Sequence, residues 1–176
     1  MVLIVAAVGR SGSGKTVTLE YLISRFSAEG YNVGVIKHIH HEGFTIDTEG
    51  KNTWRYAQAG AKAIAAISPN EIAIIKKTVN ETVSLDQVID NMKKEKLDLI
   101  FIEGYHELVA KRADVSKILT AKDTESLQEI LTDTVKPILA ISGLIAKNPK
   151  HTLIQNYPTI NIPGEGEKLV EIIKQQ

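Results

Sequence analysis

Short apolar runs alternate with longer amphipathic stretches along the chain. The apolar runs have the length of β-strands, and they cover Val2–Val8, Val33–Lys37, Ala61–Ile67, Glu71–Lys76, Leu97–Ile102, Val115–Thr120, Pro137–Ser142 and Thr159–Ile162. This alternation is typical of an α/β fold with a mainly parallel sheet. The tight link Ser68-Pro69-Asn70 joins two of the runs, and it predicts an antiparallel hairpin added to that sheet.

The stretches between the runs carry apolar side chains on the 3.6-residue period of a helix. In Lys15–Ala28, the residues Leu19, Leu22, Ile23 and Phe26 share one helical face. No repeat or linker interrupts the pattern, so we predict a single domain over residues 1–176. Further helices are predicted over Lys51–Ala59, after a capping box of Ser84 and Gln87, around Leu127–Leu131 and over Glu165–Lys174, with charged loops at His38–Gly50 and Tyr105–Asp114.

The composition is that of an ordinary globular protein, with 43% hydrophobic and 24% charged residues among 176. Basic and acidic side chains balance at 21 each, which argues against a broad basic face for nucleic acid or anionic lipid. There are no cysteines, so disulfides and thiolate metal sites are excluded. The first apolar run, Val2–Val8, is far shorter than the roughly 20 residues of a membrane span. We therefore expect a soluble, cytoplasmic protein.

The segment after the first apolar run, Gly9-Arg10-Ser11-Gly12-Ser13-Gly14-Lys15-Thr16, matches the motif G-x-x-x-x-G-K-[ST] in full. A buried strand before it and an amphipathic helix after it are the context that this motif requires. Glycines let the backbone wrap closely around a phosphate, and the loop N–H groups and the helix N-terminus direct partial positive charge at the anion. We expect Gly9–Thr16 and Val17 to bind the nucleotide phosphates. Lys15 would reach the β- and γ-phosphates, and Thr16 would bind Mg²⁺. We therefore predict a three-layer P-loop NTPase fold that binds a nucleoside triphosphate.

An acidic residue at the end of a neighbouring buried strand is the expected partner of such a loop. Glu103-Gly104 directly follows the run Leu97–Ile102. This position lies at the C-terminal edge of the strand, where ligands bind in open α/β sheets. We expect Glu103 to hold Mg²⁺ or its waters, with Asp47 as a second carboxylate near the ion. The alternative is an ordinary solvated glutamate at a strand end.

The segment His38–Gly50 is long for a loop in a compact domain, and long loops are often functional. One interpretation is a transition-metal site, since imidazoles and carboxylates are common ligands, although consecutive loop residues rarely converge on one ion. We favour a loop that lines the phosphate and magnesium side of the pocket, and a polar solvated loop stays open as an alternative. The loop holds His38, His40, His41, Glu42 and Asp47, and the candidates for the pocket are Lys37, His38, His40 and Gly104.

One longer string resembles a known family. Gly34-Val35-Ile36-Lys37-His38-Ile39-His40-His41, followed by Asp47 and Gly50-Lys51-Asn52-Thr53, is similar to the molybdopterin-guanine dinucleotide biosynthesis protein B (MobB) family. The resemblance extends from the N-terminus to about Tyr105, and it is looser beyond that residue. This string is more specific than the glycine-rich motif, and the resemblance is carried further by Gly9–Thr16, Ala59-Gly60-Ala61 and Leu99–Gly104.

The resemblance implies a mixed-sheet P-loop fold, a homodimer, and GTP with Mg²⁺ as the ligand. The implied role is to assist the MobA-like guanylyltransferase that attaches GMP to the molybdenum-bearing pterin, with weak GTPase activity at most and no assigned catalytic residue. The sequence departs from the family at Asn52-Thr53, where aspartate and serine are common. It also departs at Gly143, where an acidic residue is expected as a contact for the base.

Two other functions are compatible with the motif: an ATP-dependent small-molecule kinase or ligase, and a metal-delivery GTPase. A kinase needs an arginine-bearing lid, which is not evident, and metal delivery requires the histidine loop to bind a transition ion. The guanine motif N-K-x-D is absent, so the spacing does not identify the base. Arg10 stands where a related subclass, K-G-G-x-G-K, has a lysine that reaches across a dimer. The alternative for Arg10 is a solvated loop arginine.

Overall fold

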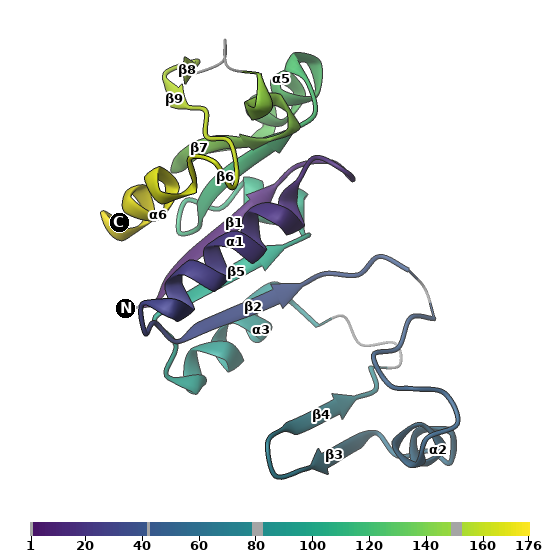
Figure 1. Ribbon diagram of the computed structural model, residues 1–176. Coiled ribbons are helices and arrows are strands. Elements are labelled where there is room, and N and C mark those ends of the chain that lie inside the picture. The colour runs from purple at the N-terminus through teal and green to yellow at the C-terminus, as the bar shows by residue number, and fades with distance from the viewer. Residues whose placement is uncertain (1, 42, 79–82, 149–152) are drawn as a thin grey trace. The chain divides into compact units, whose positions relative to one another are not determined.

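The computed structural model describes residues 2–41, 43–78, 83–148 and 153–176 (Figure 1). The chain forms two compact units. The first comprises residues 1–38 and 89–176, and the second comprises residues 39–88. Each unit is described by itself.

A parallel five-stranded sheet forms the centre of the first unit, as the alternating apolar runs predict. Its strand order is β2-β5-β1-β6-β7, and every neighbouring pair is parallel. The central strands β5 and β6 are buried along their whole length because both faces of a parallel sheet are covered, whereas the edge strand β2 alternates between buried and exposed positions. The strands are β1 (Leu3–Val8), β2 (Val33–Lys37), β5 (Leu99–Glu103), β6 (Ser116–Ala121) and β7 (Ile138–Gly143).

Helices connect these strands and cover both faces of the sheet. The connection from β1 to β2 crosses the sheet in one direction, and those from β5 to β6 and from β6 to β7 cross in the other. Because such crossovers are right-handed, α1 lies on the face opposite α4 and α5. The result is the predicted three-layer α/β arrangement. The helices of this unit are α1 (Lys15–Ala28), α4 (His106–Ala110), α5 (Thr124–Asp133) and α6 (Gly166–Lys174), with α3 (Leu85–Met92) at the boundary between the units and short 3-10 turns at Lys93–Glu95 and Leu144–Lys147.

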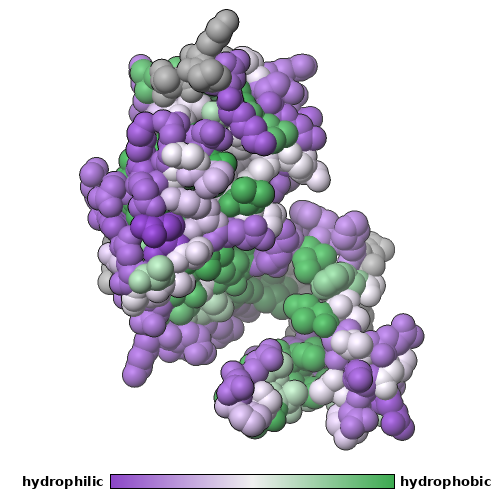
Figure 2. Space-filling model, in the orientation of Figure 1, coloured by the Kyte–Doolittle hydropathy of each residue, from purple (hydrophilic) through white to green (hydrophobic). Residues whose placement is uncertain are grey.

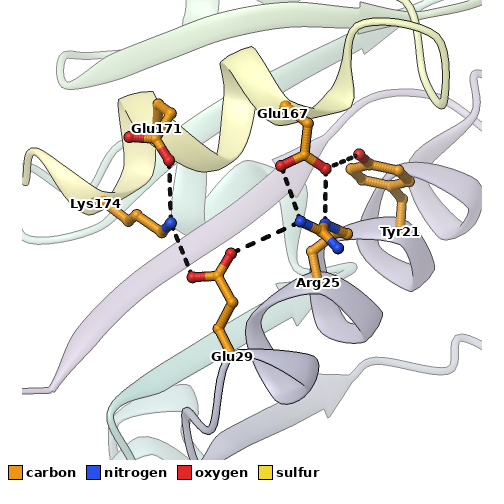
Figure 3. A network of polar contacts seen from close by, with 6 residues as sticks. All are labelled: Tyr21, Arg25, Glu29, Glu167, Glu171 and Lys174. Carbon is orange, nitrogen blue, oxygen red and sulfur yellow. Dashed lines mark hydrogen bonds and ion pairs between the residues drawn. The ribbon is translucent and has the colours of Figure 1, made fainter.

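The C-terminal helix α6 packs beside α1 on one face of the sheet. Leu22 and Phe26 of α1 and Leu169, Val170 and Ile173 of α6 belong to one buried apolar cluster with the strands. Polar side chains extend the contact at its rim, as Figure 3 shows. Their shortest contacts are Arg25 to Glu167 (2.7 Å), Tyr21 to Glu167 (2.7 Å) and Lys174 to Glu29 (2.8 Å).

The second unit contains the predicted antiparallel hairpin. Strands β3 (Ala63–Ile67) and β4 (Ile72–Lys76) pair in antiparallel register and form a two-stranded sheet of their own, which does not extend the parallel sheet. A short helix, α2 (Asn52–Gln58), precedes β3, as predicted. The capping box of Ser84 and Gln87 is also confirmed, because each backbone N–H donates to the other side chain at 2.9 and 3.2 Å.

Two elements differ from the expectation. The segment Tyr105–Asp114 was expected to be a loop, but it contains α4, a helix too short to show a 3.6-residue period in the sequence. The segment Thr159–Ile162 was expected to be a strand, but it makes only an isolated bridge from Thr159 to Ile141. Proline has no N–H to donate to a ladder, and Pro158 and Pro163 flank this segment. The preceding residues contain the two-residue strands β8 (Leu153–Ile154) and β9 (Tyr157–Pro158).

Within the described residues, no helix has both the length and the apolar content that a membrane crossing demands.

Candidate phosphate-binding site

The Gly9–Thr16 loop joins the central strand β1 to the start of α1, which is the context that the motif requires. Gly12 and Gly14 have φ values of +71° and +104°, a region that side-chain-bearing residues avoid. A turn bond from Ser13 N–H to the Arg10 carbonyl (3.3 Å) closes the loop. The loop therefore leaves the C-terminal edge of the sheet, where open α/β proteins bind ligands.

Residues at the C-terminal ends of β6 and β7 pack against this loop. The hydroxyl groups of Ser13 and Thr120 lie 2.8 Å apart, and both residues are buried. A Cβ atom added to Gly9 would lie 2.2 Å from the Thr120 carbonyl oxygen, and one added to Gly143 would lie 2.1 Å from the Ser13 carbonyl oxygen. The family resemblance implies an acidic residue at position 143, and this close approach explains why a glycine stands there. Leu144 N–H also donates to the Ser13 carbonyl (3.3 Å).

The side chain of Lys15 lies across the loop. Its ammonium group donates to the carbonyls of Gly9 (2.9 Å) and Arg10 (2.8 Å). Burial lowers the pKa of Lys15 below its usual value of 10.5; the charge of Glu103 opposes this shift, and the charge of Lys37 adds to it. A partly buried ammonium group held by two carbonyls gains from an incoming anion, which is the chemistry that the sequence predicts for this lysine.

The carboxylate of Glu103 meets two of the predicted site residues. Glu103 ends β5 and is 8% exposed, and its Oε1 atom accepts a hydrogen bond from the Thr16 hydroxyl at 3.0 Å. The Lys37 ammonium group contacts the same oxygen. This second contact follows from the parallel pairing of β2 with β5, which places Lys37 directly beside Glu103 in the register. The structure thus brings Thr16, Lys37 and Glu103 together at the edge of the sheet.

Gly104 and His38 lie directly beyond this group. His38 N–H donates to the Glu103 carbonyl at 2.8 Å, and the His38 ring stacks on Tyr105 with the ring centroids 3.9 Å apart. A Cβ atom on Gly104 would lie 2.6 Å from the Cβ atom of His38, and φ of Gly104 is +95°. Gly104 therefore lets the first residue of the histidine segment approach the end of β5.

Three other residues of the predicted site region, His40, Glu42 and Asp47, belong to the second unit. Asp47 accepts a hydrogen bond through Oδ1 from the Thr53 hydroxyl (2.7 Å), whereas its Oδ2 atom is buried without a hydrogen-bond partner in the described structure. His40 is exposed. Glu42 lies outside the described residues. Among the residues that the structure describes, no three histidine, aspartate or glutamate side chains are grouped so that they could hold a metal ion.

Arg10 connects the loop to helix α5 through a contact that the sequence does not predict. Its guanidinium group lies 2.9 Å from the Glu129 carboxylate of α5, and both side chains are exposed. Arg10 and Glu129 both line two cavities beside the loop, of about 300 Å³ and 360 Å³. Lys122 also borders the loop, since its ammonium group would lie 3.4 Å from a Cβ atom added to Gly12. No motif identified Thr120, Lys122 or Glu129, because they lie far from the loop in sequence.

The fold and the loop define a class: parallel α/β proteins with a glycine-rich loop between the first strand and the first helix. Within this class, the model of the family "Molybdopterin guanine dinucleotide synthesis protein B" (MobB) matches residues 4–142. The chain belongs to this family.

Two curated relatives share this assignment. One is the molybdopterin-guanine dinucleotide biosynthesis adapter protein of Haemophilus influenzae, which is 37% identical over 69% of this chain. The other is the adapter protein of the same name from Escherichia coli K12, which is 36% identical over 63% of this chain. The matched region spans 66% and 64% of these two relatives, which is slightly less than two thirds of their length.

A solved structure supports the fold along the whole chain. The crystal structure of Bacillus subtilis MobB aligns with a TM-score of 0.75 at 25% identity, and the alignment covers 99% of both chains.

Proposed function

We propose that this protein is a GTP-binding adapter in the biosynthesis of molybdopterin guanine dinucleotide. The observation that carries the proposal is the Gly9–Thr16 loop, with the desolvated Lys15 ammonium group across it and Glu103 at the end of the neighbouring strand. Membership of the MobB family and relatives named as adapter proteins support the pathway. GTP is the nucleotide that the family resemblance implies.

The residues present fit a magnesium ion. Mg²⁺ prefers oxygen ligands and is usually held by one or two carboxylates together with substrate phosphates. Thr16 and Glu103 provide a hydroxyl and a carboxylate oxygen within 3.0 Å of each other. From the sequence we also expect Asp47 near the ion, and its Oδ2 atom is buried without a hydrogen-bond partner among the described residues. When bound, the ion would neutralise phosphate charge, and Thr16 and Glu103 would orient it.

The proposed adapter role depends on the segment that begins at His38, beside the end of β5. Phosphate groups order nearby segments in nucleotide-controlled proteins and thereby change a binding surface. His38 begins such a segment and contacts the residues at the end of β5 directly. We propose that the bound nucleotide sets the conformation of this segment for a molybdenum-cofactor guanylyltransferase, with weak GTP hydrolysis at most.

We also propose a homodimer formed through the second unit. The β3–β4 hairpin is a two-stranded sheet, and such sheets are marginally stable alone. Ile67, Ile72 and Ile74 of this hairpin are 78%, 69% and 64% exposed, and apolar surface over the hairpin is visible in Figure 2. Pairing with a second copy would bury these side chains. Analytical ultracentrifugation tests this point, and a protein that stays monomeric at 100-fold its working concentration would refute it.

Calorimetric titration with GTP and ATP, with and without Mg²⁺, tests the nucleotide proposal. Lys15→Ala removes a charge-assisted contact worth about 1.5–3 kcal/mol, which weakens triphosphate binding by roughly tenfold or more. Thr16→Ala and Glu103→Gln should weaken binding more with Mg²⁺ than without it. Unchanged affinity in Lys15→Ala would refute the phosphate site, and a preference for ATP would favour a kinase or ligase.

The pathway assignment needs a separate experiment. The protein should bind a molybdenum-cofactor guanylyltransferase in a pull-down, with an affinity that differs between GTP, GDP and no nucleotide. The adapter proposal fails if no binding is detected in any of the three states. Stoichiometric zinc or nickel that is lost in His40→Ala would instead identify a metal-delivery protein.

A further inference from the structure

Lys37 occupies the carboxylate that the proposed metal ion would use. Its ammonium group and the Thr16 hydroxyl both contact Oε1 of Glu103. Lys37 is the last residue of the edge strand β2, and its side chain is half exposed, whereas that of Glu103 is 11% exposed. The lysine is therefore free to move on its solvent side, whereas the carboxylate is held in place.

We infer that Lys37 is a resident cation that holds Glu103 until a metal–triphosphate complex binds, and that it then transfers to the phosphate. This inference rests on the proposed function. It assigns to Lys37 a specific role, in which binding of the metal and binding of the triphosphate depend on each other.

Lys37 and the proposed metal ion compete for one oxygen atom of Glu103. A magnesium ion at Glu103 would lie within a few ångströms of the Lys37 ammonium group, and like charges repel strongly at that distance. Screening by salt is weak here because Glu103 is 8% exposed. A metal ion bound at Oε1 of Glu103 therefore competes with Lys37 for this oxygen, and its binding favours departure of the lysine.

The displaced Lys37 moves to the bound triphosphate. The charges of Lys37 and Glu103 both change the pKa of Lys15, so the three charged groups interact with one another. When the carboxylate turns to a metal ion, two ammonium groups remain at the loop. A triphosphate supplies the negative charge that both need, and Lys37 becomes a second phosphate contact beside Lys15.

The exchange predicts effects of opposite sign when the charge of Lys37 is removed. Without nucleotide, a divalent ion should bind more tightly, because nothing competes for Glu103. Without metal, a triphosphate should bind more weakly, because one cation is lost. A residue with a purely structural role would not shift the two affinities in opposite directions.

The test compares Lys37→Gln with wild type and with Lys76→Gln, which changes the last residue of another strand, β4, in the second unit. Mn²⁺ serves as a paramagnetic substitute for Mg²⁺, and its affinity for nucleotide-free protein is measured by electron paramagnetic resonance. GTP affinity is measured in EDTA by calorimetry. In Lys37→Gln we expect Mn²⁺ to bind about threefold more tightly or better, and GTP about threefold more weakly or worse. Lys76→Gln should leave both affinities unchanged.

Lys37→Arg retains the cation and controls for folding, so both affinities should stay within about twofold of wild type. The inference is overturned if Lys37→Gln changes neither affinity, or if it lowers both. In either case GTP binding by wild type would leave the proposed function standing. If wild type itself binds no GTP, with or without metal, the proposed function fails and the inference fails with it.

Discussion

Substitution of Gly143 tests whether its packing against Ser13 stabilises the Gly9–Thr16 loop. Its φ and ψ are +89° and −155°, a region that is essentially restricted to glycine and costs other residues about 1–3 kcal/mol. A Cβ atom there would also lie 2.1 Å from the Ser13 carbonyl oxygen and 3.0 Å from that of Ala121. Relieving such an overlap adds about 1–3 kcal/mol, as overpacking does elsewhere. We expect Gly143→Ala to lower the free energy of unfolding by about 2–6 kcal/mol.

Gly30 is a matched control for this substitution. Its φ is also +89°, but a Cβ atom there would meet nothing within 4 Å. Gly30→Ala should therefore cost only the backbone strain, about 1–2 kcal/mol. Urea titration measures the free energy of unfolding of both variants, and it is compared where their m-values equal that of wild type. Because Gly143→Ala displaces the Ser13 carbonyl, it should also weaken GTP binding, which Gly30→Ala should leave unchanged. Equal losses of stability in the two variants, with equal GTP affinity, would refute the packing of Gly143 against the loop.

Two further predictions concern charged groups away from the loop. The ammonium group of Lys117 donates to the Arg112 carbonyl, and burial lowers the pKa of this lysine. Between that lowered pKa and 10.5, the unfolded chain therefore binds more protons than the folded one. Wild type should therefore gain stability relative to Lys117→Met as the pH rises through this window in urea titrations, and parallel curves would show that Lys117 does not titrate there. Hydrogen bonds from Tyr21 and then Arg25 lower the pKa of Glu167 below 4.5, so its stabilising contribution is present above that value and is lost as the pH falls through the folded pKa. The difference in thermal midpoint between wild type and Glu167→Gln should shrink on acidification and at high salt, whereas a constant difference would assign the effect to packing alone.

Local patterns predict the elements of this protein well. The loop lies between β1 and α1 because its glycines, strand and helix are contiguous in sequence. The capping box of Ser84 and Gln87 depends on residues three apart, and it forms as predicted. The hairpin follows from two apolar runs joined by a three-residue link. In each case the chemistry that decides the structure lies within a few residues.

Contacts between distant segments could not be predicted in this way. Lys37 meets Glu103 only because β2 pairs with β5, a choice of neighbour that no periodicity encodes. Ser13 meets Thr120 across 107 positions, and Arg10 meets Glu129 across a similar separation. The glycine at position 143 departed from the family pattern without a visible reason, and its close approach to Ser13 supplies that reason. Strand order therefore determines the part of the site that the sequence alone left open.

The same strand order has a consequence for synthesis on the ribosome. The first strand, β1, is central, and its neighbours β5 and β6 begin at Leu99 and Ser116. Residues 39–88, which form the second unit, therefore emerge completely before β1 has a strand to pair with. Such distant pairings slow folding and leave apolar strands exposed in the meantime. The Gly9–Thr16 loop of a growing chain therefore lacks the contacts of Thr120 and Gly143 until most of the protein has been translated.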